Sequence, residues 1–162
     1  MNKALHKSER MDWETPWSVV HAVAHLLNID RFDLDPAADP DNAKADDYIS
    51  LLHDRDGLAE SWWGNVWLNP PYGREIGAWV AKAAWEATHN RKVNLVAALV
   101  TARTDTHWWH DHVSKASTVM LLKGRIRFVD AEASAPFPSA VVVWKREPMP
   151  APTRYMLVKL GG

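Results

Sequence analysis

The sequence of 162 residues contains no cysteine. This absence excludes disulfide bonds, thiolate zinc sites and cysteine nucleophiles, and it fits a reducing compartment. The sequence also lacks an apolar run of the roughly 18 residues that a membrane-spanning helix needs. Its first ten residues are polar and mixed in charge, without the apolar core of a signal peptide. We therefore expect a soluble, cytoplasmic protein with no membrane partner.

Neither sign of charge is in excess. The chain has 19 Lys and Arg against 20 Asp and Glu, and its formal net charge is −1. Proteins that coat phosphates along a nucleic acid are strongly basic, so any contact with DNA has to come from a local patch.

The hydrophobic content of 47% is enough for one core, and the length is typical of one domain. We expect a single domain over residues 1–162, with its core at about 12–145 and a tail or edge strand at 146–162.

Hydrophobic periodicity and turn signals predict alternating helices and strands. Helices are expected over residues 17–28, 75–88 and 105–113. Strands are expected over residues 32–38, 48–52, 66–68, 94–100, 118–122, 140–144 and, at an edge, 155–160. The alternation predicts an α/β fold, with a mostly parallel sheet flanked by helices.

The segment Asn69-Pro-Pro-Tyr72 follows a predicted strand and precedes a predicted helix. Two consecutive prolines fix two φ angles and stiffen the loop, which can then hold the Asn69 side-chain carbonyl and the Pro70 main-chain carbonyl as paired acceptors. Two acceptors aimed at an exocyclic NH2 group direct its nitrogen lone pair toward an electrophilic methyl group. Tyr72 offers a face for stacking the substrate ring. Taken alone, the motif is equally consistent with a rigid turn in which Asn69 caps its own backbone.

A second unusual segment, Asp35-Pro36-Ala37, ends the first predicted strand. Ligands of open α/β sheets bind at the carboxyl ends of strands, and both segments are expected there. Asp33 and Asp35 alternate along the strand and point to opposite faces, so only Asp35 is placed to meet a ligand.

Taken together and in order, the motifs resemble those of the small phage-type DNA N-6-adenine methyltransferases, Dam-like members of the Asn-Pro-Pro-Tyr amino-methyltransferases. The resemblance covers residues 12–144 and rests on these segments: Asp12-Trp-Glu-Thr-Pro16, Phe32-Asp-Leu-Asp-Pro-Ala-Ala38, Asn42-Ala-Lys44, Asp56-Gly-Leu58, Trp67-Leu-Asn-Pro-Pro-Tyr-Gly73, Ala102-Arg-Thr-Asp-Thr106, Gly124-Arg125 and Ala135-Pro-Phe-Pro-Ser139. It implies a Rossmann-like methyltransferase fold, S-adenosylmethionine as methyl donor, and adenine N6 in double-stranded DNA as target.

The resemblance also implies roles for individual residues. The expected catalytic residues are Asn69, Pro70, Pro71 and Tyr72. The expected cofactor-binding residues are Trp13, Thr15, Pro16, Asp35, Pro36, Ala37, Asn42 and Asp56. Among these, Asp35 is expected near the methionine part of the cofactor and Asp56 at its adenine ring. One departure is the glycine-rich turn that usually follows the first strand, which is replaced here by residues 37–43.

The chain leaves no room for a separate target-recognition domain, so DNA contacts fall to the loops at 103–115 and 123–135. The expected DNA-binding residues are Arg103, Thr104, Trp108, His110, Lys123 and Arg125. A homodimer that shares this task is an alternative. Because Trp108 and Trp109 are adjacent, they cannot both face one core, and we expect at least one to be exposed.

The sequence leaves three further questions open. The histidines at 107, 110 and 112 and Asp111 have a spacing that suits a metal, but they lack a distant partner set, and we expect no metal. Because Asn-Pro-Pro-Tyr recognises an NH2 group more than the molecule that carries it, the alternative targets are cytosine N4, adenine in RNA and glutamine in a protein. A catalytically silent phage DNA-binding module is the alternative from another class. The resemblance implies a phage or prophage origin and action in the bacterial host cytoplasm.

Overall fold

The computed structural model describes residues 13–147 and 151–160, so Asp12 of the first quoted motif lies outside the described residues. The helices are α1 (Trp17–Leu26), α2 (Ile76–His89) and α3 (His107–His112), with short 3-10 turns η1 (Leu51–His53) and η2 (Val113–Lys115). The strands are β1 (Leu34–Asp35), β2 (Asp47–Tyr48), β3 (Gly64–Leu68), β4 (Val93–Thr101), β5 (Thr118–Leu122), β6 (Ser139–Lys145) and β7 (Arg154–Val158). Within the described ranges, none of the helices has the length and apolar character needed to cross a membrane.

The strands form one seven-stranded sheet in the order β2-β1-β3-β4-β6-β5-β7. The expected α/β fold with flanking helices is confirmed and is consistent with a methyltransferase fold. The expectation of a mostly parallel sheet is wrong, because β6 runs antiparallel to both β4 and β5 and makes the sheet mixed. The physical reason is the connection from β5 to β6, which contains no helix that could carry the chain back across the sheet for a parallel return. The segment after β6 adds β7 as an edge strand, parallel to β5.

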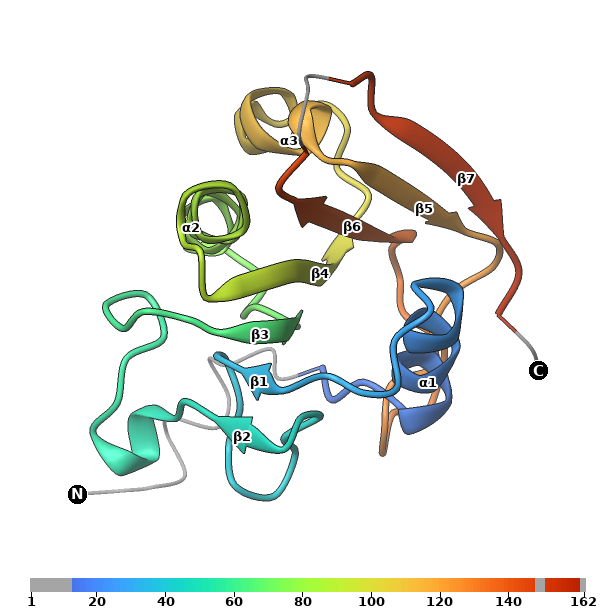
Figure 1. Cartoon of the computed structure of the whole chain (residues 1–162). Helices are drawn as coiled ribbons and strands as arrows, with labels where there is room; N and C mark the ends of the chain where they lie inside the picture. The colour runs from blue at the N-terminus through green and yellow to red at the C-terminus, as the bar shows by residue number, and fades with distance from the viewer. Residues whose placement is uncertain (1–12, 148–150, 161–162) are drawn as a thin grey trace.

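Helices cover both faces of the sheet (Figure 1). α1 packs on one face, and α2 and α3 pack on the other. β4 lies between β3 and β6 and serves both layers: Val96, Ala98 and Val100 belong to the core beneath α2, whereas Ala97 and Leu99 belong to the core beneath α1. This two-sided burial explains why the sequence of β4 is almost continuously apolar.

The second predicted strand is shorter than expected. β2 contains only two residues, and the chain then turns into η1 because the Ser50 hydroxyl accepts a hydrogen bond from the Leu52 amide at 3.2 Å. Leu51 and Leu52 are 58% and 65% exposed. Their apolar character is therefore not a strand signal, and Leu51 lies instead at the rim of a pocket.

The sheet topology brings four loops to one edge. β1, β3, β4 and β5 run in the same direction, so the loops that follow them leave from the same side of the sheet. Two of these loops are tied together where the Ala102 amide donates to the Pro138 carbonyl at 2.9 Å. Both Asp35 and the Asn-Pro-Pro-Tyr segment are at this edge, as the sequence predicts.

Gly57 allows two backbone segments to touch near this edge. A Cβ atom added to Gly57 would lie 2.0 Å from the Pro36 carbonyl oxygen and 2.8 Å from the Trp79 ring. The Gly57 carbonyl accepts a hydrogen bond from the indole N–H of Trp62 at 2.8 Å. The segment before β3 is therefore packed directly against the loop that follows β1.

We predict that Gly57→Ala lowers the free energy of unfolding by about 1–3 kcal/mol, because the methyl group can only be accommodated by separating backbones. Urea-induced unfolding measures this loss. Gly77→Ala on α2 is the matched control, because its added methyl would meet Trp108 at an ordinary 3.6 Å and alanine favours helix over glycine. Equal stabilities for the two variants would contradict the prediction.

Candidate active site

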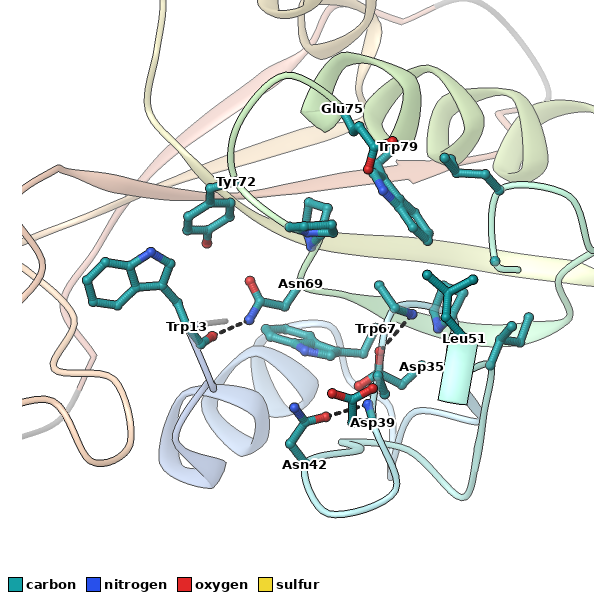
Figure 2. A pocket seen from close by; sticks show the side chains of 18 of the residues that line it. Trp13, Asp35, Asp39, Asn42, Leu51, Trp67, Asn69, Tyr72, Glu75 and Trp79 are labelled. Atoms are coloured by element: carbon teal, nitrogen blue, oxygen red, sulfur yellow. Dashed lines mark hydrogen bonds between the residues drawn. The ribbon is translucent and has the colours of Figure 1, made fainter. Parts of the chain in front are cut away.

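A pocket of about 440 Å³ opens at the carboxyl ends of β1 and β3, within the size range of small-molecule sites. Figure 2 shows Trp13, Asn69 and Tyr72 toward one end, with Asp39, Asn42 and Leu51 on the far side of Trp67. The pocket walls come from residues 13–15, the loop after β1, the turn at 55–58, the loop after β3, and Trp79 of α2. Segments far apart in the sequence thus enclose one cavity.

Most of the residues expected at the site line this pocket. All four residues of the Asn-Pro-Pro-Tyr segment do so. The expected cofactor-binding residues that line it are Trp13, Thr15, Asp35, Pro36, Ala37, Asn42 and Asp56. Pro16 does not; it caps α1, and its carbonyl accepts a hydrogen bond from the Val19 amide at 3.0 Å.

Asn69 is held with its amide group in one orientation. Its Nδ2 atom donates a hydrogen bond to the Trp13 main-chain carbonyl at 2.5 Å. A carbonyl oxygen can only accept, so the NH2 end of the amide has to face it. The other end, Oδ1, is buried and has no hydrogen-bond partner among the described residues. A buried acceptor left without a donor costs about 1–3 kcal/mol, which a ligand carrying a suitable N–H group would recover.

Residues 13–16, which we call the N-terminal strap, hold Asn69 in place. The carboxylate of Glu14 forms an ion pair with Lys44 at 2.8 Å, and Lys44 is only 5% exposed. The Glu14 carbonyl accepts a hydrogen bond from the Val129 amide at 3.0 Å. The strap therefore connects the loop after β1, the loop after β5 and Asn69.

Asp35 is a buried carboxylate at the end of β1. Its two oxygens accept hydrogen bonds from the amides of Ala37 at 3.3 Å and Lys44 at 3.0 Å. Burial raises the pKa of Asp35 to about 7, against the opposing effects of these two N–H groups and of the Lys44 charge. Asp35 thus shapes the loop that stands in place of a glycine-rich turn. Its burial costs desolvation free energy, and this cost increases when the carboxyl group ionises.

Tyr72 belongs to an aromatic cluster made of Trp13, Tyr72, Phe128 and Phe137. Its hydroxyl donates to the Leu99 carbonyl at 3.2 Å, and burial raises its pKa well above the ordinary value. Its ring meets Phe137 edge to face at 5.5 Å, and Phe137 meets Trp13 in the same way at 5.6 Å. The cluster therefore joins the Asn-Pro-Pro-Tyr loop to the strap and to the loop after β5.

The sequence analysis missed several residues of the pocket lining. Trp67 and Trp79 both line it with buried indole N–H groups that have no partner in the described part of the chain. The hydroxyl of Thr15, a residue that was expected at the site, is likewise buried without a partner among the described residues. Trp67 stands two positions before Asn69, a strand spacing that puts both on one face and offers a signal. Trp79 gives no such signal, because its position on α2 is that of a core residue.

The pocket lining carries more negative than positive side chains. Its charged residues are the five acids Glu14, Asp35, Asp39, Asp56 and Glu75 and the three bases Lys44, Arg55 and Arg74. This excess suits a ligand with a net positive charge.

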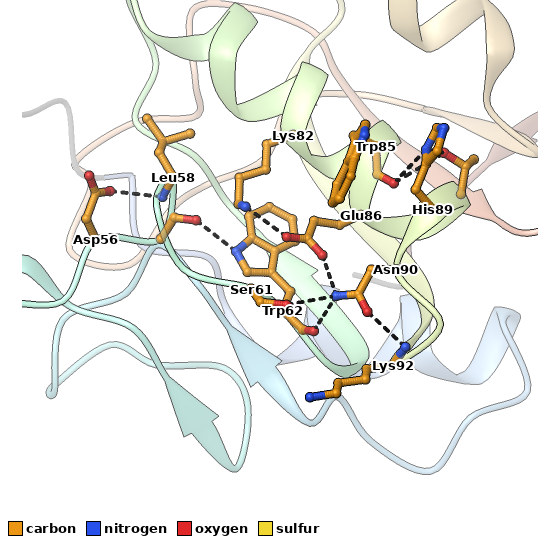
Figure 3. Close-up of polar contacts among 12 residues, drawn as sticks. Asp56, Leu58, Ser61, Trp62, Lys82, Trp85, Glu86, His89, Asn90 and Lys92 are labelled. Carbon is orange, nitrogen blue, oxygen red and sulfur yellow. Dashed lines mark hydrogen bonds and ion pairs between the residues drawn. The ribbon is translucent and has the colours of Figure 1, made fainter.

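A polar network supports the turn that contains Asp56 (Figure 3). Glu86 of α2 is 1% exposed and accepts hydrogen bonds from Lys82 at 2.8 Å and Asn90 at 2.6 Å. Asn90 also donates to the Trp62 carbonyl at 2.9 Å, and the Trp62 indole N–H holds the Gly57 carbonyl. Asp56 itself is exposed and accepts from the Leu58 amide at 2.9 Å.

None of the expected DNA-binding residues lines the pocket. Those that are exposed, on or next to the loops after β4 and β5, are Arg103, Thr104, His110, Lys123 and Arg125. Trp109 is buried and Trp108 is half-buried beside Gly77. The expectation that one of the two rings is exposed is therefore wrong, because α3 packs against both α2 and the sheet. Over residues 13–147 and 151–160, no group of three or more His, Asp or Glu side chains is arranged to hold a metal.

We predict that Asp35 makes stability fall with rising pH. The folded state keeps the Asp35 proton up to about pH 7, whereas the unfolded chain loses it near pH 4. Between these values the free energy of unfolding therefore decreases, by at most about 1.4 kcal/mol per pH unit. Asp35→Asn removes this contribution. Unfolding of both proteins at pH 4 to 8 gives the difference, and a difference that does not change with pH would refute the prediction.

Comparison with known proteins matches these features to one family. Residues 2–152 match the family described as "DNA N-6-adenine-methyltransferase (Dam)". The chain is 30% identical over 128 residues to a DNA N-6-adenine-methyltransferase of Haemophilus phage HP1, an alignment that covers 78% of this chain and 70% of that protein. It is 30% identical over 114 residues to a DNA N-6-adenine-methyltransferase of Escherichia phage T1, covering 68% of this chain and 44% of that protein. The resemblance seen in the motifs is confirmed, and the chain belongs to the Dam family of DNA N-6-adenine-methyltransferases.

Proposed function

We propose that this chain transfers a methyl group from S-adenosylmethionine to the N6 amino group of adenine in double-stranded DNA. Family membership supports the reaction class, and methyltransferases in general use this donor. The observation that carries the proposal for this chain is Asn69, a residue of the pocket lining: its Nδ2 is bonded to the Trp13 carbonyl, and its buried Oδ1 has no partner among the described residues.

The Asn-Pro-Pro-Tyr loop positions the amine. Asn69 Oδ1 accepts one hydrogen of the NH2 group, and the Pro70 carbonyl accepts the other, which directs the nitrogen lone pair away from the protein. Pro71 stiffens the loop. Tyr72 stacks the extruded base, with its hydroxyl kept on the Leu99 carbonyl. No side chain forms a covalent bond during transfer, and no metal takes part.

The remainder of the pocket fits S-adenosylmethionine. When bound, it supplies an electrophilic methyl group on a positively charged sulfonium. The excess of carboxylates suits that charge, and the unpartnered Thr15 hydroxyl and Trp79 indole N–H are available to a ligand. Asp35 is assigned to the methionine part, together with Thr15. Asp56 is assigned to the adenine ring, and Trp67, Ala37 and Asn42 complete the lining.

The loops at the same edge of the sheet form the DNA interface. Arg103 and Arg125 contact phosphates, assisted by Thr104, His110 and Lys123, whereas Trp108 is engaged in packing against α2. The whole chain acts as a single methyltransferase domain, in the cytoplasm of a bacterial host and from a phage or prophage gene. A homodimer remains an alternative means of reading DNA.

The first experiment measures transfer of labelled methyl from S-adenosylmethionine to unmethylated double-stranded DNA, followed by nucleoside analysis. N6-methyladenine is the expected product. N4-methylcytosine, or transfer only to RNA or protein, would assign the site to another amino group. Absence of cofactor binding would favour a silent DNA-binding module.

We predict that Asn69→Ala lowers kcat by about 100-fold or more, because one preorganised acceptor is lost from the transition state. Affinity for S-adenosylhomocysteine, measured by calorimetry, should remain within about threefold, since the lost acceptor faces the amine and a threefold change is well below 1 kcal/mol. Asn94→Ala, at an exposed position on β4, is the matched control and should retain wild-type kcat. Comparable losses of cofactor affinity and kcat in Asn69→Ala would count against the assigned role.

We predict that cofactor affinity increases with pH through about 7, because a cationic ligand favours ionised Asp35 and the proton has to leave first. Asp35→Asn should weaken S-adenosylmethionine binding by about tenfold or more at pH 8 and remove most of this pH dependence. Calorimetric titrations at pH 6, 7 and 8 measure both effects. Asp30→Asn, at an exposed turn after α1, is the control. A pH dependence that persists in Asp35→Asn would assign it to another group.

A further inference from the structure

We propose that the indole N–H of Trp13 reads the target base, by donating a hydrogen bond to a ring nitrogen of the extruded adenine. This inference rests on the proposed function and adds a residue that determines specificity. The sequence predicts a cofactor contact for Trp13, whereas its contacts in the structure favour the target base.

Trp13 contacts both Asn69 and the aromatic cluster. Its carbonyl holds the amide of Asn69, and its ring packs at 5.1 Å from Phe128 and 5.6 Å from Phe137. Phe137 in turn contacts Tyr72. The Trp13 ring therefore belongs to the end of the pocket where Asn69 and Tyr72 meet the base (Figure 2).

This end of the pocket contains one donor and one acceptor without partners among the described residues. Asn69 Oδ1 is an acceptor and Trp13 Nε1 is a donor; both atoms are buried, and neither has a partner in the described chain. A buried donor or acceptor without a partner is unfavourable. A ligand that supplies one donor beside one acceptor pairs with both groups and is therefore strongly preferred over a ligand that leaves them unpaired.

The edges of adenine match this donor and this acceptor. Adenine carries its N6 amino group between two ring acceptors, N1 and N7, so either edge offers a donor next to an acceptor. Thymine and the O6 edge of guanine would place a carbonyl oxygen opposite Asn69 Oδ1, where two acceptors repel each other. Cytosine shares the donor and acceptor pattern but is smaller, and the nucleoside analysis described above separates its methylation from that of adenine.

The other unpartnered indoles lie elsewhere in the pocket. Figure 2 shows Trp67 between Asn69 and Asp35, and Trp79 beside Glu75. Both are thereby available to the cofactor. Among the described residues, Trp13 is the one with an unpartnered indole N–H in the aromatic cluster that contains Tyr72. A base that enters the pocket stacks on rings of this cluster and replaces some of the contacts that the rings make with one another.

The test combines a variant with substrate analogues. Trp13→Phe keeps an aromatic ring and removes the donor. The target adenine, located first by sequencing the methylated DNA, is replaced in a synthetic duplex by 7-deazaadenine or 1-deazaadenine, which each lack one ring acceptor. Single-turnover methyl transfer and equilibrium binding of each duplex are measured for wild type, Trp13→Phe and the control Trp85→Phe, whose ring is 54% exposed on the outer side of α2.

For wild type, one of the two analogues should lower the transfer rate by about 10- to 100-fold, the usual effect of an unpaired buried donor. Trp13→Phe should lower the rate on normal adenine by a similar factor and lose sensitivity to that analogue, with less than about threefold further change. Trp85→Phe should behave as wild type. If variant and analogue effects simply multiply, or if neither analogue affects wild type, the Trp13 proposal fails while adenine methylation stands. If no DNA adenine is methylated by wild type, the proposed function itself fails.

Discussion

The hydrogen bond between Asn69 and the Trp13 carbonyl is the constraint on which the site depends. It joins residues 56 positions apart in the sequence, and it decides which end of the amide is left free. An amide exposed to water would satisfy both ends by rotation, whereas among the described residues only the NH2 end of Asn69 has a protein partner. The strap that provides the carbonyl is itself held by Lys44 and Val129. The orientation of the Asn69 amide therefore depends on the loop after β1 and on the loop after β5 at the same time.

Asp35 adds an electrostatic constraint at the neighbouring strand. Two amide hydrogens and the charge of Lys44 favour its ionised form, but the ammonium group of Lys44 is engaged by Glu14 at 2.8 Å. Desolvation is the largest effect, and the pKa stays at about 7. In the free protein, the negative charge of ionised Asp35 is thus only partly compensated by neighbouring groups. A cationic ligand supplies the missing charge, so its binding energy is gained partly from relief of a cost that folding imposes.

The sequence predicts the elements of this fold better than the contacts between them. β4 and α2 are recognisable because burial on a sheet or a helix face leaves a local period in the residues. The meeting of Asp35 with Asn69 follows from parallel strands that open at one edge. The reversal of β6 was missed because the loop at 123–138 has no local feature that reports strand direction. Leu51, Leu52 and Trp108 were misjudged because exposure depends on tertiary packing.

The same limit applies to the most informative atoms of the site. Trp13 and Asn69 each keep one buried group without a partner in the part of the chain that the structure describes. This is a property of their surroundings, and no residue pattern encodes it. The motif identifies an amino-group methyltransferase, whereas the unpaired donor and acceptor indicate which base edge fits. Specificity is therefore read from what the fold leaves unsatisfied, and only the folded structure reveals that.

The separation of charge also explains how a chain with net charge −1 can act on DNA. Exposed cations stand on the loops after β4 and β5, whereas the pocket lining holds five acidic and three basic side chains. Exposed cations attract phosphates, whereas an excess of carboxylates repels them. A base without formal charge, turned out of the duplex, is the part of DNA that can enter. An excess of acidic side chains in the pocket thus suits both the uncharged base and the cationic methyl donor that we propose.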